Sequence, residues 1–206
     1  MPRLFSLIVL VVSLNQLSFA QDSQSTILMM TGKIIEGKIV SRDSFYVYYD
    51  YEKASGKVKQ NRLDLERVFS ITTGEEEDVV YYMDADIGNY FTIDEMRYYI
   101  KGEQDASEYY KANWTIWAGL PITAGLSYVT ASTIIVFAVP FAYLVAAGLP
   151  KYKIKREATS SSELISEPAY VLGYERTARQ KRVFKALATG LVGTVVGIAA
   201  RSVVSP

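Results

Sequence analysis

The densest group of side chains that could do chemistry is a set of carboxylates near the middle of the chain. Asp84 and Asp86 lie two residues apart, and Asp94 and Glu95 follow shortly after them. Asp84, Asp86 and Glu95 occupy positions one, three and twelve of a possible calcium-binding loop. Closely placed carboxylates can also supply the acid and the base of a hydrolase. The sequence therefore raises both a metal site and a catalytic site at this point.

A turn followed by a capped helix explains the same carboxylates better. A calcium loop needs glycine at its sixth position, and here Gly88 stands at the fifth. Thr92 and Glu95 have the spacing of a capping box, in which each side chain binds the backbone N–H of the other residue. We therefore predict no metal-binding and no catalytic residue in this segment.

The chain contains no histidine and no cysteine. This excludes Ser-His-Asp and Cys-His catalysis, zinc–histidine chemistry and any disulfide framework. We predict that the protein is not an enzyme and needs no cofactor. Residues 1–20 have the positive start, short apolar core and small residues before Gln21 that are typical of a cleaved signal peptide. The alternative is an uncleaved signal anchor, but the apolar core is shorter than the roughly 20 residues that a membrane span needs.

The elements after this signal begin with a predicted small β-domain, residues 21–74. Five short apolar and aromatic runs are separated by turn residues, with a single tight turn before the last run. The runs are residues 26–30, 33–41, 45–49, 57–63 and 67–72. Their rhythm resembles that of a small five-stranded SH3-like or Sm-like barrel, and Gly37 inside the second run is typical of a bend or bulge.

Many Sm-like barrels bind RNA, but the charge of this segment opposes that function. Residues 21–112 carry 11 basic and 18 acidic side chains. A surface with this excess of negative charge repels phosphate, so we predict no nucleic-acid partner. Residues 75–112 are expected to form an acidic linker, a strand and turn, and two short helices that Thr92 and Asp105 cap.

Residues 113–150 form the first of two apolar segments and carry no charged side chain. As one helix they would be about 57 Å long, against a hydrocarbon core of roughly 30 Å. Pro121 and Pro140 are the expected break points. We predict one transmembrane crossing with a break, and a double crossing or a re-entrant hairpin is the alternative. Trp114 and Trp117 are predicted to lie at the membrane interface.

Residues 151–185 form a basic connector, with 9 basic and 4 acidic side chains. Basic residues gather on the cytoplasmic side of membrane spans. We therefore predict that residues 21–112 are periplasmic and residues 151–185 cytoplasmic, if the protein lies in the inner membrane. Lys151, Lys153, Arg182 and Lys185 are the predicted interfacial cations of this connector.

Residues 186–206 form a second, glycine-rich transmembrane segment. Gly190, Gly193 and Gly197 share one helical face. Small residues at such spacing let two membrane helices approach closely. The partner of this face is expected to be the first apolar segment, and another copy of the chain is the alternative.

The chain resembles uncharacterised exported envelope proteins of Bacteroidota-type bacteria. The residues that carry the resemblance are Thr31-Gly32-Lys33-Ile34-Ile35-Glu36-Gly37-Lys38-Ile39, Arg97-Tyr98-Tyr99-Ile100-Lys101-Gly102-Glu103-Gln104-Asp105-Ala106, and Gly173-Tyr174-Glu175-Arg176 with Lys181-Arg182. The resemblance implies an exported, membrane-anchored protein. It implies no activity, cofactor or substrate.

Together these patterns predict an α+β protein: a small β-barrel, short capped helices and two hydrophobic transmembrane helices. The expected function is a non-catalytic structural or protein-interaction role in the bacterial envelope, exerted through the exported acidic β-domain. The alternative is a small oligomeric transport or channel component or an accessory subunit, although ion paths usually leave a charged residue within the membrane. The expected partners are membrane lipids and either another envelope protein or a second copy of the chain.

Overall fold

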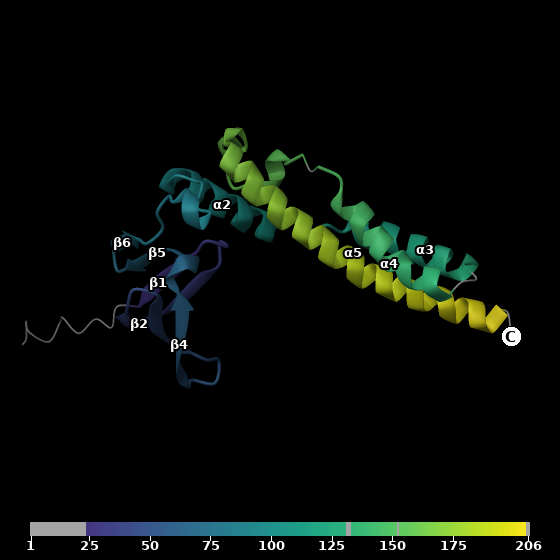
Figure 1. Cartoon of the computed structure of the whole chain (residues 1–206), viewed down its shortest axis with the longest axis horizontal. Helices are drawn as coiled ribbons and strands as arrows, with labels where there is room; N and C mark the ends of the chain where they lie inside the picture. The colour runs from purple at the N-terminus through teal and green to yellow at the C-terminus, as the bar shows by residue number, and fades with distance from the viewer. Residues whose placement is uncertain (1–23, 131–132, 152, 205–206) are drawn as a thin grey trace, which may run out of the picture. The chain divides into compact units, whose positions relative to one another are not determined.

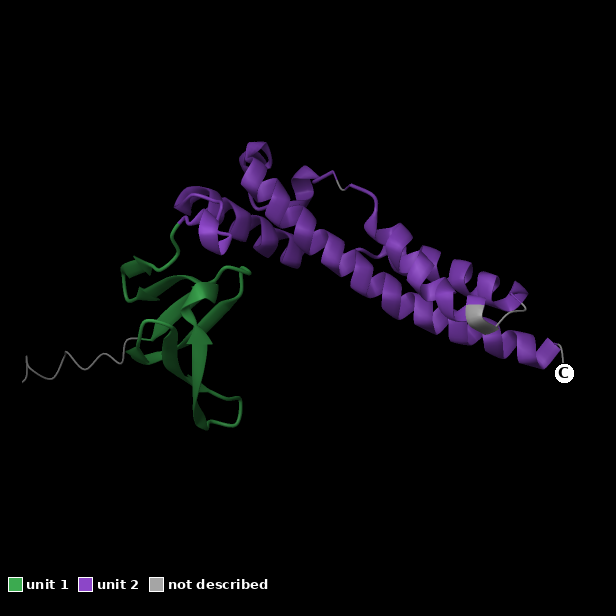
Figure 2. Ribbon diagram, in the orientation of Figure 1, with its two compact units in different colours: residues 1–82 green, residues 83–206 purple. Residues whose placement is uncertain are grey.

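The computed structural model describes residues 24–130, 133–151 and 153–204, and the predicted signal peptide lies outside these ranges. The chain divides into two compact units, and the boundary between them in the sequence lies between Tyr82 and Met83 (Figure 2). We call residues 24–82 the sheet unit and residues 83–204 the helical unit, and each is described by itself.

The sheet unit is one antiparallel sheet of six strands (Figure 1). The strands are β1 (Ser25–Met29), β2 (Ile34–Arg42), β3 (Tyr46–Glu52), β4 (Val58–Asp64), β5 (Val68–Thr73) and β6 (Glu76–Val79), in the spatial order β4-β3-β2-β1-β5-β6. Its core consists of buried side chains from both halves of the sheet. They are Ile27, Val47, Tyr49, Val68 and Ile71.

The sheet bends along β2, because this long strand belongs to both halves. Its first residues pair with β1, and its last residues pair with β3. A register shift between Ile39 and Ser41 marks a bulge. At the buried Gly37 a methyl group would lie 2.6 Å from the carbonyl oxygen of Asp50 on β3, so the bend needs glycine there.

The predicted closed barrel is wrong, because the sheet is open and has a sixth strand. The acidic run that was expected to be a linker forms β6 and pairs with β5. Among the described residues no ladder joins the edge strands β4 and β6. The curl of the sheet instead brings Arg42 of β2 to Asp78 of β6, with 2.5 Å between Nη1 and Oδ2. The predicted tight turn before the fifth strand is present as the 3₁₀ turn Leu65–Arg67.

The helical unit is built around one long helix, α5 (Pro168–Val204). The helix α2 (Ile93–Tyr109) packs on the first half of α5, and α3 (Trp114–Val129) and α4 (Thr133–Gly148) pack on its second half (Figure 1). Three short 3₁₀ turns, Ala85–Ile87, Arg156–Ala158 and Ser162–Ser166, lie in the connecting loops.

The two predicted short helices of residues 93–112 are a single helix. Gly102 does not end α2, because it lies inside the helix against the backbone of α5. Asp105 does not begin a new helix, because its side chain accepts hydrogen bonds from the loop residue Ser160 instead.

Residues 113–150 do not form the single broken helix that was expected of a first transmembrane segment. These residues form a helical hairpin in which α3 and α4 run antiparallel, because Thr115 near the start of α3 accepts a 2.6 Å hydrogen bond from the hydroxyl of Tyr143 near the end of α4. The helix α3 ends at Val129 and α4 begins at Thr133, whereas Pro121 and Pro140 lie inside the helices. Each proline removes one backbone N–H donor from its helix, but packing against the neighbouring helices keeps the rest of the helix in place.

The predicted boundary between a connector ending at residue 185 and a span beginning at residue 186 is absent, since α5 continues through it for 37 residues. The described part of the chain therefore does not show the two transmembrane helices that were predicted. Of the described helices, α5 alone is long and apolar enough to cross a membrane, by length and composition.

Candidate functional site

The polar head of the helical unit, residues 83–112 and 153–185, is held together where α2 crosses α5. Gly102 lies against the backbone of Tyr170 and Tyr174, and Gly173 lies against the backbone of Tyr99. Neither glycine has room for a methyl group. The two helices therefore meet backbone to backbone through a reciprocal pair of glycines.

Beside this crossing, one buried carboxylate is fully satisfied. The Oδ2 atom of Asp105 accepts hydrogen bonds from the backbone N–H of Ser160 at 2.8 Å, from its hydroxyl at 2.7 Å and from the hydroxyl of Tyr170 at 2.8 Å. Lys101 lies 3.2 Å from Oδ1. Burial alone would raise the pKa of Asp105, but these hydrogen bonds outweigh it and hold the pKa below its ordinary value. Asp105 thus fastens the loop before α5 to α2.

A second buried carboxylate is poorly satisfied. Glu103 lies 3.6 Å from Arg176, and Arg176 also donates a 2.7 Å hydrogen bond to the hydroxyl of Tyr99. The Oε2 atom of Glu103 is buried and has no hydrogen-bond partner among the described residues. Burial raises the pKa of Glu103, and the positive charge of Arg176 only partly opposes this.

The carboxylates that first suggested chemistry serve local structure. Asp84 accepts the backbone N–H of Asp86 at 3.0 Å, and Thr92 and Glu95 form both hydrogen bonds of the predicted capping box. Asp94 lies in the first turn of α2. In the described part of the chain, no group of three or more metal-ligating residues is close enough to hold an ion.

The apolar bundle consists of α3, α4 and residues 186–204 of α5, and its composition is reversed relative to a water-soluble bundle. Large apolar side chains point outward: Leu120, Ile122, Leu126, Val129, Ile135, Phe137, Phe141, Val145, Leu191, Val192, Val195 and Val196. In α3 and α5, small and hydroxyl-bearing residues point inward: Thr115, Gly119, Thr123, Ser127, Thr189, Gly190, Gly193, Thr194 and Gly197. In α4 the buried residues include Val136, Val139, Tyr143 and Ala147. Exposed apolar surface of this extent is typical of contact with lipid.

The glycines singled out in the sequence lie in the seams of this bundle. Gly193 and Gly197 contact α3 at Thr123 and Ser127, and Gly190 contacts Pro140 of α4 at 3.1 Å from the position of a Cβ atom. All three glycines thus pack within the same chain. The sequence did not indicate that Gly119 of α3 would lie against the ring of Tyr143, 2.6 Å from the position of a Cβ atom.

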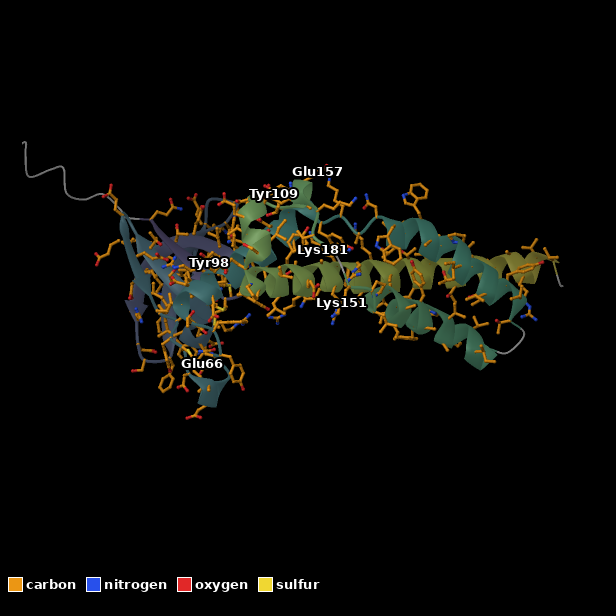
Figure 3. The ribbon with its side chains drawn as sticks, turned by 90° about the horizontal axis from the view of Figure 1, so that it is seen from above. Glu66, Tyr98, Tyr109, Lys151, Glu157 and Lys181 are labelled. Atoms are coloured by element: carbon orange, nitrogen blue, oxygen red, sulfur yellow. The ribbon has the colours of Figure 1, made fainter. Side chains whose placement is uncertain are left out.

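A basic collar surrounds the end of the apolar bundle that adjoins the polar head. It consists of Lys111, Lys151, Lys181, Arg182 and Lys185, and Lys151 and Lys181 lie at the same level along α5 (Figure 3). Lys181 donates to the last carbonyls of α2, at Ala106, Ser107 and Tyr110. Cations at this position stabilise the negative end of a helix.

Two further collar residues fasten the ends of the α3–α4 hairpin to α5. The buried Arg182 donates a 2.7 Å hydrogen bond to the carbonyl of Pro150, just after α4. Lys185 donates to the carbonyl of Lys111 at 2.7 Å and to Asn113 at 3.2 Å, just before α3. Both ends of the hairpin therefore lie at one end of the bundle.

The other predicted interfacial residues lie at the same end. Trp114 begins α3, and Trp117, which is 80% exposed, follows one turn later. Lys151 and Lys153 are exposed in the loop after α4. At the opposite end of the bundle, Arg201 donates to the carbonyl of Thr130.

These contacts correct the predicted sides of the chain. Residues 83–112 and 153–185 were expected on opposite sides of a membrane, but they contact each other directly through Gly102, Gly173 and Asp105. Helices separated by a bilayer could not make these contacts.

The chain matches no protein-family model, no curated protein and no solved structure.

Proposed function

We propose that the protein is a non-catalytic membrane protein of the bacterial cell envelope, in which the helical unit is the anchor and the sheet unit docks another protein. The observation that carries the proposal is the composition of the apolar bundle, which exposes large apolar side chains on its outside while α3 and α5 turn small residues inward. Such a surface is stable only where lipid or a partner covers it.

The dimensions of the bundle support a membrane anchor. Residues 186–204 of α5 would extend about 28 Å, and α3 and α4 about 24 Å each. These lengths are close to the roughly 30 Å of a hydrocarbon core, and a small mismatch is accommodated by local thinning of the bilayer. Between Lys185 and Arg201 the second half of α5 carries no charge.

The sheet unit is the proposed docking module because it exposes apolar and aromatic side chains outside its core. They include Ile34, Val40, Phe45 and Val58, of which Phe45 is 73% exposed. Aromatic residues are enriched in protein interfaces. No catalytic step is part of the proposal, since the carboxylates that could have carried one act in a turn and a helix cap.

Two measurements test the proposal on the full-length chain. An integral anchor stays in the membrane pellet after an alkaline carbonate wash and is released by detergent. A photo-crosslinking residue at Phe45 should give a discrete adduct with an envelope protein, whereas the same residue at the exposed loop position Lys53 should not. Release by carbonate would overturn the anchor, and an equal, diffuse pattern at both positions would overturn the docking role.

A further inference from the structure

A groove lies between the end of α2 and the middle of α5, within the helical unit. Its volume is about 700 Å³. One wall is apolar and is formed by Val183, Phe184 and Leu187 of α5. The rim is basic and is formed by Lys111, Lys181 and Lys185. The groove thus combines a positive rim with an apolar wall.

The groove lies where the polar head meets the apolar bundle. Phe184 is 76% exposed and stands next to Lys185, which is the last charged residue of α5 before Arg201. Leu187 continues the apolar wall toward the bundle. In the proposed membrane anchor, this level corresponds to the boundary between lipid head groups and acyl chains.

The basic rim is positive after its internal contacts are counted. Glu108 is the one acidic residue among those that line the groove, against three lysines. Lys181 donates three hydrogen bonds to carbonyls at the end of α2, whereas Lys185 donates two hydrogen bonds and has one N–H group left. Lys111 is exposed, and among the described residues no hydrogen bond or ion pair holds its ammonium group. Lys111 and Lys185 therefore have donors to offer an anion.

We propose that this groove binds one anionic phospholipid, with its phosphate between Lys111 and Lys185 and an acyl chain along Phe184 and Leu187. The inference rests on the proposed membrane anchor. A lysine near an anionic membrane surface contributes attraction that corresponds to about a fivefold change in binding. An apolar wall next to those lysines adds burial of hydrocarbon.

A phospholipid fits the groove better than a free phosphate ion does. A free phosphate would interact with the lysine rim but would leave Phe184 and Leu187 in contact with water. A lipid satisfies both parts of the groove at once, because its head group is negative and its acyl chain is apolar. A lipid can also enter from the side, since the groove opens next to the lipid-facing surface of the bundle.

The test measures which lipid stays on the purified full-length protein. The protein is placed in bilayers that contain equal amounts of phosphatidylglycerol and phosphatidylcholine, is extracted in mild detergent and is examined by native mass spectrometry. The expected result is one retained phosphatidylglycerol per chain. Lys111→Gln should lower this retention about fivefold, and Phe184→Ala should also lower it, because the acyl chain loses its apolar wall.

The matched control is Lys155→Gln, which removes one positive charge from an exposed position of the loop between α4 and α5, outside the groove. An equal loss in Lys155→Gln and Lys111→Gln would show general attraction to a basic surface and would overturn the site. Lys111 serves as the main test because its side chain holds no other element in place. Lys185→Gln is a second test, with circular dichroism to check that the helices remain folded.

Two further arms separate the possible failures. Loss of the bound lipid in millimolar inorganic phosphate would assign the rim to a free anion and overturn the lipid site. A protein that resists carbonate extraction but retains no lipid selectively would overturn this inference and leave the proposed anchor intact. A protein that is released by carbonate would overturn both.

Discussion

Arg182 donates a hydrogen bond of 2.7 Å from its guanidinium to the carbonyl oxygen of Pro150, and this contact closes the apolar hairpin against α5. Arg182 is almost completely buried, so its charge must be offset locally. The carbonyl of Pro150, just after the negative end of α4, provides part of this offset, while the buried Nε of Arg182 has no hydrogen-bond partner among the described residues. The same arrangement recurs where Lys181 ends α2. The basic residues Lys181 and Arg182 of α5 therefore hold the ends of other helices in place. A prediction that uses basic residues only to mark the cytoplasmic side of a membrane misses this role.

The first prediction concerns the side of the membrane on which each segment lies. Because the chain has no cysteine, single cysteines can be introduced at three exposed positions, Tyr90, Glu157 and Ser202. Cysteines at positions 90 and 157 should react with a membrane-impermeant maleimide from the same side, since both belong to the polar head. The cysteine at position 202 should react from the opposite side, because α5 crosses the bilayer once in the proposed anchor.

The sequence alone leads to the opposite result. With a single crossing by residues 113–150, positions 90 and 157 would lie on different sides, and position 202 would lie on the side of position 90. Labelling of that kind would show that the contacts between α2 and α5 do not form in the membrane. Maleimide added after detergent treatment should label all three variants and serves as the control for access.

The second prediction tests the crossing of α2 and α5. Gly102→Ala and Gly173→Ala each place a methyl group against the backbone of the other helix, which cannot move like a flexible side chain. We expect each substitution to destabilise the helical unit by about 1–3 kcal/mol and to lower its unfolding temperature in detergent. Gly125→Ala is the matched control, because nothing lies within 4 Å of its Cβ position. An equal effect of the three substitutions would contradict the reciprocal crossing.

These glycines show what the sequence could and could not indicate. The local elements were predictable: the five strand runs, the turn before the last of them and the capping box of Thr92 and Glu95 all depend on neighbouring residues. Gly102, however, has the same local signature whether it ends a helix or lies inside one against another helix. Its role depends on Gly173, which is 71 positions away, and a single sequence does not pair the two.

The errors in the apolar region have a similar physical origin. Pro121 and Pro140 are strong break signals in isolation, but tertiary packing keeps both inside helices. The helix α3 ends instead at Val129, where the local sequence offers no glycine or proline. The acidic run at β6 was assigned to a linker because charge suggests solvent. An edge strand can carry charge, however, because one of its sides faces no neighbouring strand.

The third prediction is the pH dependence of Asp105. Its pKa in the folded state lies below the ordinary value of about 4. A lowered carboxyl pKa contributes stability above the unfolded pKa, and this contribution is lost as the pH falls through the folded pKa. We expect Asp105→Asn to lower the unfolding temperature at pH 7 and to differ less from the parent protein below about pH 4. Thermal unfolding in detergent at both pH values is the measurement.

The fourth prediction, for Glu103, has the opposite sign. The pKa of Glu103 is raised in the folded state. Its favourable contribution to stability is therefore present below its pKa in the unfolded state, about 4, and is lost as the pH rises through its pKa in the folded state. The ionised Glu103 therefore costs stability at neutral pH. We expect Glu103→Gln to raise the unfolding temperature at pH 7 and to have no such effect in acid. A decrease at pH 7 would mean that the pair with Arg176 outweighs the burial of the charge.

The fifth prediction concerns the bend of the sheet along β2, at Gly37. At Gly37 a methyl group would lie 2.6 Å from the carbonyl of Asp50 and 3.0 Å from the ring of Tyr49, and neither the strand nor the buried ring can move without disturbing the core. Gly37→Ala should therefore lower the unfolding temperature of the sheet unit clearly. Asp78→Asn breaks the exposed ion pair with Arg42 and should cost less than about 1 kcal/mol. If the two substitutions were equal in effect, the bend would not depend on glycine at position 37.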